Sequence, residues 1–84
     1  MRMKDKNVVV TGAARSIGKA VAERFAEEGA NVAILDVLEE RGQETAAEIT
    51  KEHGVKAVFY KCNVGEKKQV DSTIEQVITD FGHI

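Results

Sequence analysis

The stretch from Val8 to Gly18 constrains this chain most, because it joins an apolar strand to a helix through a glycine turn. Three consecutive valines, Val8–Val10, predict a short strand that is covered on both faces. Gly12 then permits a tight turn that a Cβ would obstruct. The helix that follows presents unpaired N–H groups and the positive end of its dipole at this turn. This order of elements is typical of a site that binds phosphate.

The rest of the chain alternates strand-like and helical segments. Strands are predicted over 7–11, 31–35 and 57–62, and helices over 15–28, 39–53 and 66–80. This alternation predicts an α/β fold with a three-stranded parallel sheet. Right-handed crossovers give the strand order 3-2-1, with the first two helices on one face and the third on the other. The clearer period-two pattern of 57–62 predicts an edge strand.

Apolar residues at helical spacing predict the face that each helix buries. The predicted buried positions are Ile17, Ala20, Val21 and Phe25 in the first helix, Leu38, Gly42, Thr45, Ala46 and Ile49 in the second, and Val70, Ile74, Val77, Ile78 and Phe81 in the third.

Composition excludes several classes of function. A chain of 84 residues with a net charge of −2 forms one domain and lacks the basic surface that nucleic-acid binding needs. No apolar run is long enough to cross a membrane, and the charged N-terminus does not resemble a signal peptide. The single cysteine, Cys62, excludes an internal disulfide and is predicted to be a packed thiol. No metal-ligand spacing is present, and we expect a cytoplasmic protein.

Asp36 is the second informative position, since it ends the second predicted strand 24 residues after Gly12. A carboxylate at this place can accept hydrogen bonds from ribose hydroxyls and repels a 2′-phosphate. The alternative is an ordinary polar strand end. Its spacing from the glycine turn favours the ribose role, and NAD over NADP.

The motif residues Thr11, Gly12 and Gly18 fit the pattern T-G-x-x-x-G-x-G, with Ser16 in place of the middle glycine. Asn63-Val64 follows the third predicted strand, at the place where sequences with this pattern usually carry Asp-Val. Phe81-Gly82 begins a turn after the third predicted helix. In these features the whole chain resembles the short-chain dehydrogenase/reductase family. The resemblance implies the N-terminal half of a Rossmann fold, so that residues 1–84 form a partial dinucleotide-binding domain without its catalytic half.

The resemblance also implies roles for individual residues. Arg15 stands where NADP-using members carry a basic residue for the 2′-phosphate, although it could contact the diphosphate or pair with Asp36. Asn63 could accept a hydrogen bond from the adenine amino group, and Val37 and Val64 either pack on the ring or belong to the core. The candidate cofactor-binding residues are Gly12, Arg15, Ser16, Ile17, Gly18, Asp36, Val37, Asn63 and Val64.

Members of this family reduce a carbonyl or oxidise an alcohol by hydride transfer, with a Tyr-x-x-x-Lys motif for the proton. The only tyrosine here is Tyr60, and the residue four places on is Val64. We therefore expect the cofactor-binding part of an NAD(P)-dependent oxidoreductase, similar to 3-oxoacyl-acyl-carrier-protein reductases or sugar and polyol dehydrogenases. The chain has no candidate catalytic residue and is predicted to be inactive alone. The alternative is a stand-alone nucleotide-binding or interaction module.

The resembled fold places a fourth strand beside the first, and that strand is missing from this sequence. The apolar strand at 7–11 would then keep one unpaired edge, which favours edge-to-edge pairing. We expect a homo-oligomer formed through this edge.

Overall fold

The computed structural model describes residues 4–12 and 16–84. Six elements alternate along them as the sequence predicts, and each boundary falls within about a residue of its predicted place, the usual uncertainty at element ends. The elements are β1 (Asn7–Thr11), α1 (Ser16–Glu27), β2 (Asn31–Asp36), α2 (Glu39–His53), β3 (Ala57–Lys61) and α3 (Lys67–Phe81).

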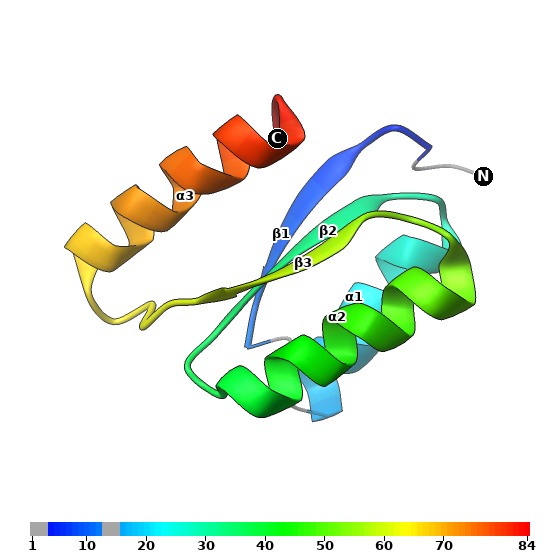
Figure 1. Cartoon of the computed structure of the whole chain (residues 1–84), viewed down its shortest axis with the longest axis horizontal. Helices are drawn as coiled ribbons and strands as arrows, with labels where there is room; N and C mark the ends of the chain where they lie inside the picture. Colours follow the sequence, from blue (N-terminus) through cyan, green and yellow to red (C-terminus); the bar gives the residue numbers. More distant parts are fainter. Residues whose placement is uncertain (1–3, 13–15) are drawn as a thin grey trace.

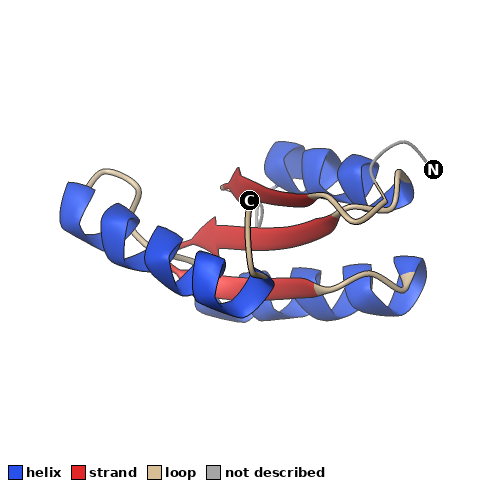
Figure 2. Cartoon of the chain, turned by 90° about the horizontal axis from the view of Figure 1, so that it is seen from above, coloured by secondary structure: helices blue, strands red, loops and turns tan. Residues whose placement is uncertain are grey.

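The strands form one parallel sheet in the order β1-β2-β3, which confirms the predicted topology. β2 lies in the middle, and its residues 32–36 are buried. Figure 2 shows the strands side by side between the helices. β3 pairs only with β2 among the described residues, so the predicted edge strand is confirmed.

The sheet is covered by helices on both faces, as Figure 1 shows. Side chains of α1 and α2 pack on one face around Ile34, and α3 packs on the other face through Val77. Cys62 is buried in this second cluster, at 1% exposure, so the prediction of a packed thiol is confirmed. The two-sided cover explains why the strand sequences are almost continuously apolar.

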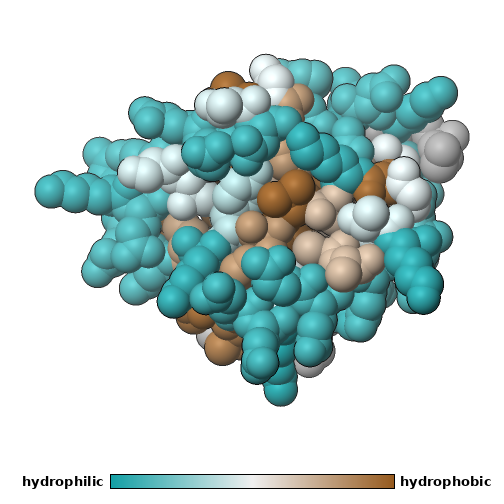
Figure 3. Space-filling view, in the orientation of Figure 1, coloured by the Kyte–Doolittle hydropathy of each residue, from teal (hydrophilic) through white to brown (hydrophobic). Residues whose placement is uncertain are grey.

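The predicted buried face of α1 is wrong in part. Ile17 is 83% exposed and Val21 is 43% exposed, whereas Ala22 and Ala26 are buried against the sheet. Small side chains let the helix axis approach the strands, and this rotates the larger aliphatic side chains outward. Three more of the predicted buried positions are exposed: Ala20, Leu38 at 36% and Ile78 at 46%. Figure 3, in the orientation of Figure 1, shows an apolar area at the centre, between α3 and the pair α1 and α2, with hydrophilic side chains around it.

Hydrogen bonds attach the end of α3 to the sheet. The Asn7 side chain donates to the carbonyl oxygens of Phe81 (3.3 Å) and His83 (3.1 Å). The Tyr60 hydroxyl donates to Oδ2 of Asp80 at 2.6 Å. Burial, together with this bond, raises the pKa of Tyr60 above its ordinary value. Tyr60 is therefore a protonated structural group that joins β3 to α3.

Candidate functional site

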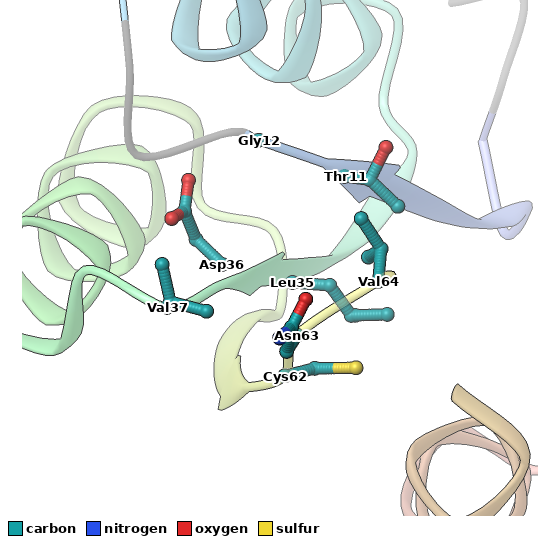
Figure 4. Close-up of a pocket in the computed structure, with 8 residues that line it drawn as sticks. All are labelled: Thr11, Gly12, Leu35, Asp36, Val37, Cys62, Asn63 and Val64. Carbon is teal, nitrogen blue, oxygen red and sulfur yellow. The ribbon is translucent and has the colours of Figure 1, made fainter. Parts of the chain in front are cut away.

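The carboxyl ends of the three strands meet at one edge of the sheet, because all the strands run in the same direction. Parallel α/β sheets bind ligands at this edge. A cavity of about 280 Å³ lies there, close to the lower limit for small-molecule sites. Figure 4 shows the residues that line it: Thr11, Gly12, Leu35, Asp36, Val37, Cys62, Asn63 and Val64.

Asp36 is the chemically distinctive residue of this cavity. Asp36 is only 4% exposed. One carboxyl oxygen, Oδ1, accepts the Leu38 N–H at 3.0 Å. The other, Oδ2, is buried and has no hydrogen-bond partner among the described residues. A buried acceptor without a partner is unfavourable. Oδ2 of Asp36 therefore lacks a donor, which the described residues do not supply.

Gly12 lines the cavity beside Asp36. Its φ is +67°, in the left-handed region where a side chain is strained. Its N–H donates to the carbonyl oxygen of Leu35 at 2.8 Å, which ties the turn to β2 close to Asp36. The first residue of α1 is Ser16, so the electropositive end of a helix follows the turn by a few residues. An anion beside Gly12 would meet this field.

Two valines give the cavity apolar flanks. Val37 is 44% exposed and Val64 is 52% exposed, and both line the cavity that Asp36 lines. Neither belongs to the two buried core clusters. A flat aromatic ligand could cover these side chains, which removes apolar surface from water.

The predicted site residues thus fall into three groups. Gly12, Asp36, Val37, Asn63 and Val64 line this cavity together. Ile17 and Gly18 line a neighbouring cavity of about 570 Å³, which shares Thr11 and Gly12 with the first. Arg15 lies outside the described residues, and for Ser16 only the backbone is described, as the start of α1.

Sequence reasoning missed several residues of the site. Leu35 lines the cavity as the last apolar side chain of β2, and Cys62 lines it as the residue directly after β3. Gln69 is the more informative omission, since its side chain contacts the backbone of Asn63. The available signal was the place of Gln69 in the first turn of the helix, three residues after the N-cap, from which a glutamine side chain can reach back to preceding backbone N–H groups.

The described residues contain no group of three or more metal-ligating side chains placed to hold an ion. None of the helices in 16–84 combines the length and apolar composition that a bilayer crossing requires.

A parallel sheet with a glycine turn after β1 and a buried carboxylate at the end of β2 defines the class of Rossmann-like nucleotide-binding folds. The family model described as short chain dehydrogenase matches residues 6–84. The chain therefore belongs to the short-chain dehydrogenase family.

Relatives and solved structures agree with this membership. The chain is 39% identical over 79 residues to a diacetyl reductase, (S)-acetoin forming, of Staphylococcus epidermidis, covering 94% of this chain and 30% of that protein. It matches NAD⁺-bound xylitol dehydrogenase with a TM-score of 0.95 and 38% identity, over 100% of this chain and 32% of the other. It matches L-sorbose reductase from Gluconobacter frateurii, complexed with NADPH and L-sorbose, with a TM-score of 0.91 and 33% identity, over 98% and 32%. The chain thus spans about a third of the length of these relatives.

Proposed function

We propose that residues 1–84 are the adenosine-binding part of an NAD(P)-dependent oxidoreductase that reduces a carbonyl or oxidises an alcohol. In this proposal Gly12 and the start of α1, with Arg15, Ser16, Ile17 and Gly18, hold the diphosphate. Asp36 accepts a hydrogen bond from the adenosine ribose. Val37 and Val64 flank the adenine ring, and Asn63 accepts from its amino group.

The observation that carries this proposal is the lone buried oxygen of Asp36. Asp36 lines the cavity. Its Oδ1 accepts the Leu38 N–H, while its Oδ2 has no hydrogen-bond partner among the described residues. A ribose hydroxyl supplies the missing donor. The chemistry of the cavity, one acceptor between two apolar flanks and an electropositive turn, fits a nucleotide.

NAD is the proposed cofactor in preference to NADP. A 2′-phosphate would bring negative charge to a buried carboxylate, where Coulomb repulsion is poorly screened. The relatives include one structure with NAD⁺ and one with NADPH, so the family uses both nucleotides. Arg15 is the residue that would oppose this preference, by attracting a 2′-phosphate.

Among the described residues we find no group placed to transfer a proton to a substrate. Tyr60 lies within β3, and its hydroxyl is bound to Asp80. We therefore propose that the 84-residue chain binds nucleotide without catalysis, and that the reaction needs the part of the relatives that it does not match. The names of the relatives favour a sugar, polyol or small diketone as the substrate class of a full-length parent. We propose that the substrate of such a full-length protein is a small carbonyl compound or alcohol of the cytoplasm.

The test is calorimetric or NMR titration with NAD and with NADP. The wild-type chain is expected to bind NAD more tightly, and Asp36→Asn should weaken NAD binding about tenfold, because a charge-assisted hydrogen bond becomes a neutral one. The preference over NADP should shrink in the same variant. Asp71→Asn, an equal change of charge on the exposed surface of α3, is the matched control and should bind like wild type. Equal binding of both nucleotides, unchanged by Asp36→Asn, would refute the ribose role.

We also propose that two copies pair through β1. Among the described residues β1 is bonded to β2 alone, and apolar side chains at Ile17 and Val21 are exposed next to this edge. An unpaired apolar strand edge is a template for a second strand. Light scattering should therefore give a dimer mass that falls on dilution, and Val9→Lys should give a monomer at every concentration. A monomeric wild type at high concentration would contradict this assembly.

A further inference from the structure

The loop between β3 and α3 is closed by a circuit of hydrogen bonds. The backbone N–H of Asn63 donates to Oε1 of Gln69 at 2.9 Å. Nε2 of Gln69 donates to Oε2 of Glu66 at 2.7 Å, and the Glu66 N–H donates to the carbonyl oxygen of Asn63 at 3.0 Å. Asn63, Glu66 and Gln69 are thus each hydrogen-bonded to the other two. The first turn of α3 and the cavity wall form one connected unit.

Gln69 supplies the anchor on the α3 side of this wall. On the sheet side, the Cys62 N–H donates to the carbonyl oxygen of Asp36 at 2.9 Å, which continues the β2–β3 ladder by one residue. Asn63 follows directly, beyond the end of β3, and is exposed. Neighbouring residues of a strand direct their N–H groups to opposite sides, so the Asn63 N–H points away from β2. The Gln69 side chain supplies its acceptor on that side.

The side chain of Asn63 is fixed as well as its backbone. Its Oδ1 accepts the Gly65 N–H at 3.0 Å. This bond determines which end of the carboxamide is oxygen, because the amide NH₂ could not accept from Gly65. In Figure 4 the oxygen is turned toward the space that the lining residues surround. A carbonyl oxygen has a second lone pair, which remains for a ligand donor.

We infer that Gln69 is a positioning residue for base recognition: by holding the Asn63 backbone it fixes the loop in which the Gly65 N–H orients the carboxamide, and the oxygen of that carboxamide reads a 6-amino purine against a 6-oxo purine. This inference rests on the proposed function. An adenine base presents an amino donor to this oxygen. A hypoxanthine base presents a carbonyl at the same place, and two facing acceptors repel each other. A fixed orientation is needed for the discrimination, since a freely rotating carboxamide would offer its NH₂ to the carbonyl.

The experiment compares the dissociation constants of AMP and IMP for the 84-residue chain, measured by NMR titration. The wild type is expected to bind AMP about fivefold more tightly than IMP, the factor that one hydrogen bond contributes. Gln69→Ala should bring this ratio close to one and should speed hydrogen exchange at the Asn63 amide by a similar factor. A purely structural role would weaken both nucleotides equally and leave the ratio unchanged.

Gln76→Ala is the matched control. Gln76 is also an exposed glutamine of α3, and its Nε2 donates to Oδ1 of Asp80 at 2.9 Å, at the opposite end of the helix. It should preserve both the AMP-to-IMP ratio and the exchange rate of Asn63. If the wild type prefers AMP and Gln69→Ala keeps that preference, the inference is wrong while the proposed function stands. A wild type that binds neither nucleotide overturns the proposed function and this inference with it.

Discussion

Ile34→Ala is expected to lower the free energy of unfolding by about 4 kcal/mol, the upper part of the range for truncating a buried isoleucine. Ile34 lies at the centre of the middle strand with 0% of its surface exposed, and it belongs to the cluster beneath α1 and α2. A chain of this length has a total stability of about 4–13 kcal/mol. The loss is therefore between about a third and all of the total stability, and the urea midpoint, followed by circular dichroism, should fall accordingly.

Ile17→Ala is the matched control for this change. It removes the same atoms from a side chain that is 83% exposed, so the free energy of unfolding should change by no more than about 0.5 kcal/mol. Equal losses in the two variants would show that Ile17 is covered in solution. They would support the proposed pairing of two copies and contradict a monomer with an exposed α1.

Gly42→Ala is expected to destabilise the chain by about 2 kcal/mol, although alanine is the better helix former. A Cβ at position 42 would lie 2.1 Å from Cδ1 and Cε1 of the Phe59 ring and 2.9 Å from its Cγ. The contact involves the base of the ring, so a simple rotation cannot relieve it. α2 would have to move away from β3. The midpoint of thermal unfolding, followed by circular dichroism, should fall accordingly.

The double variant Gly42→Ala/Phe59→Leu tests this explanation. If the ring causes the loss, the two changes should be less damaging together than the sum of their separate effects, since the smaller leucine leaves room for the methyl group. Strict additivity of the two losses would place the cost elsewhere, in the backbone of α2.

The order of the elements could be predicted because it depends on local properties. Continuous apolar runs such as Val8–Val10 fit strands covered on both faces, and Gly29 and Gly54 mark helix ends through positive φ. The strand order and the helix faces followed from the handedness of crossovers, a general property of twisted strands. The gathering of Gly12, Asp36 and Asn63 at one edge is a consequence of parallel strands.

The buried face of α1 could not be predicted in the same way. Ile17 and Val21 have the spacing of a core stripe, yet Ala22 and Ala26 are the residues that meet the sheet. Periodicity gives the angle between side chains but not the rotation of the helix on the strands. That rotation depends on how closely the axis can approach, which the small residues decide.

The sequence by itself determined the alternating fold, the glycine turn after β1 and the acidic end of β2, because each is encoded by residues close together in the chain. Only the tertiary structure decided that Oδ2 of Asp36 is left without a partner and that Gln69 holds Asn63. It also placed Gly42 beneath Phe59. These features arise from side chains that meet across elements, and their contacts are set by packing distances that no local pattern contains.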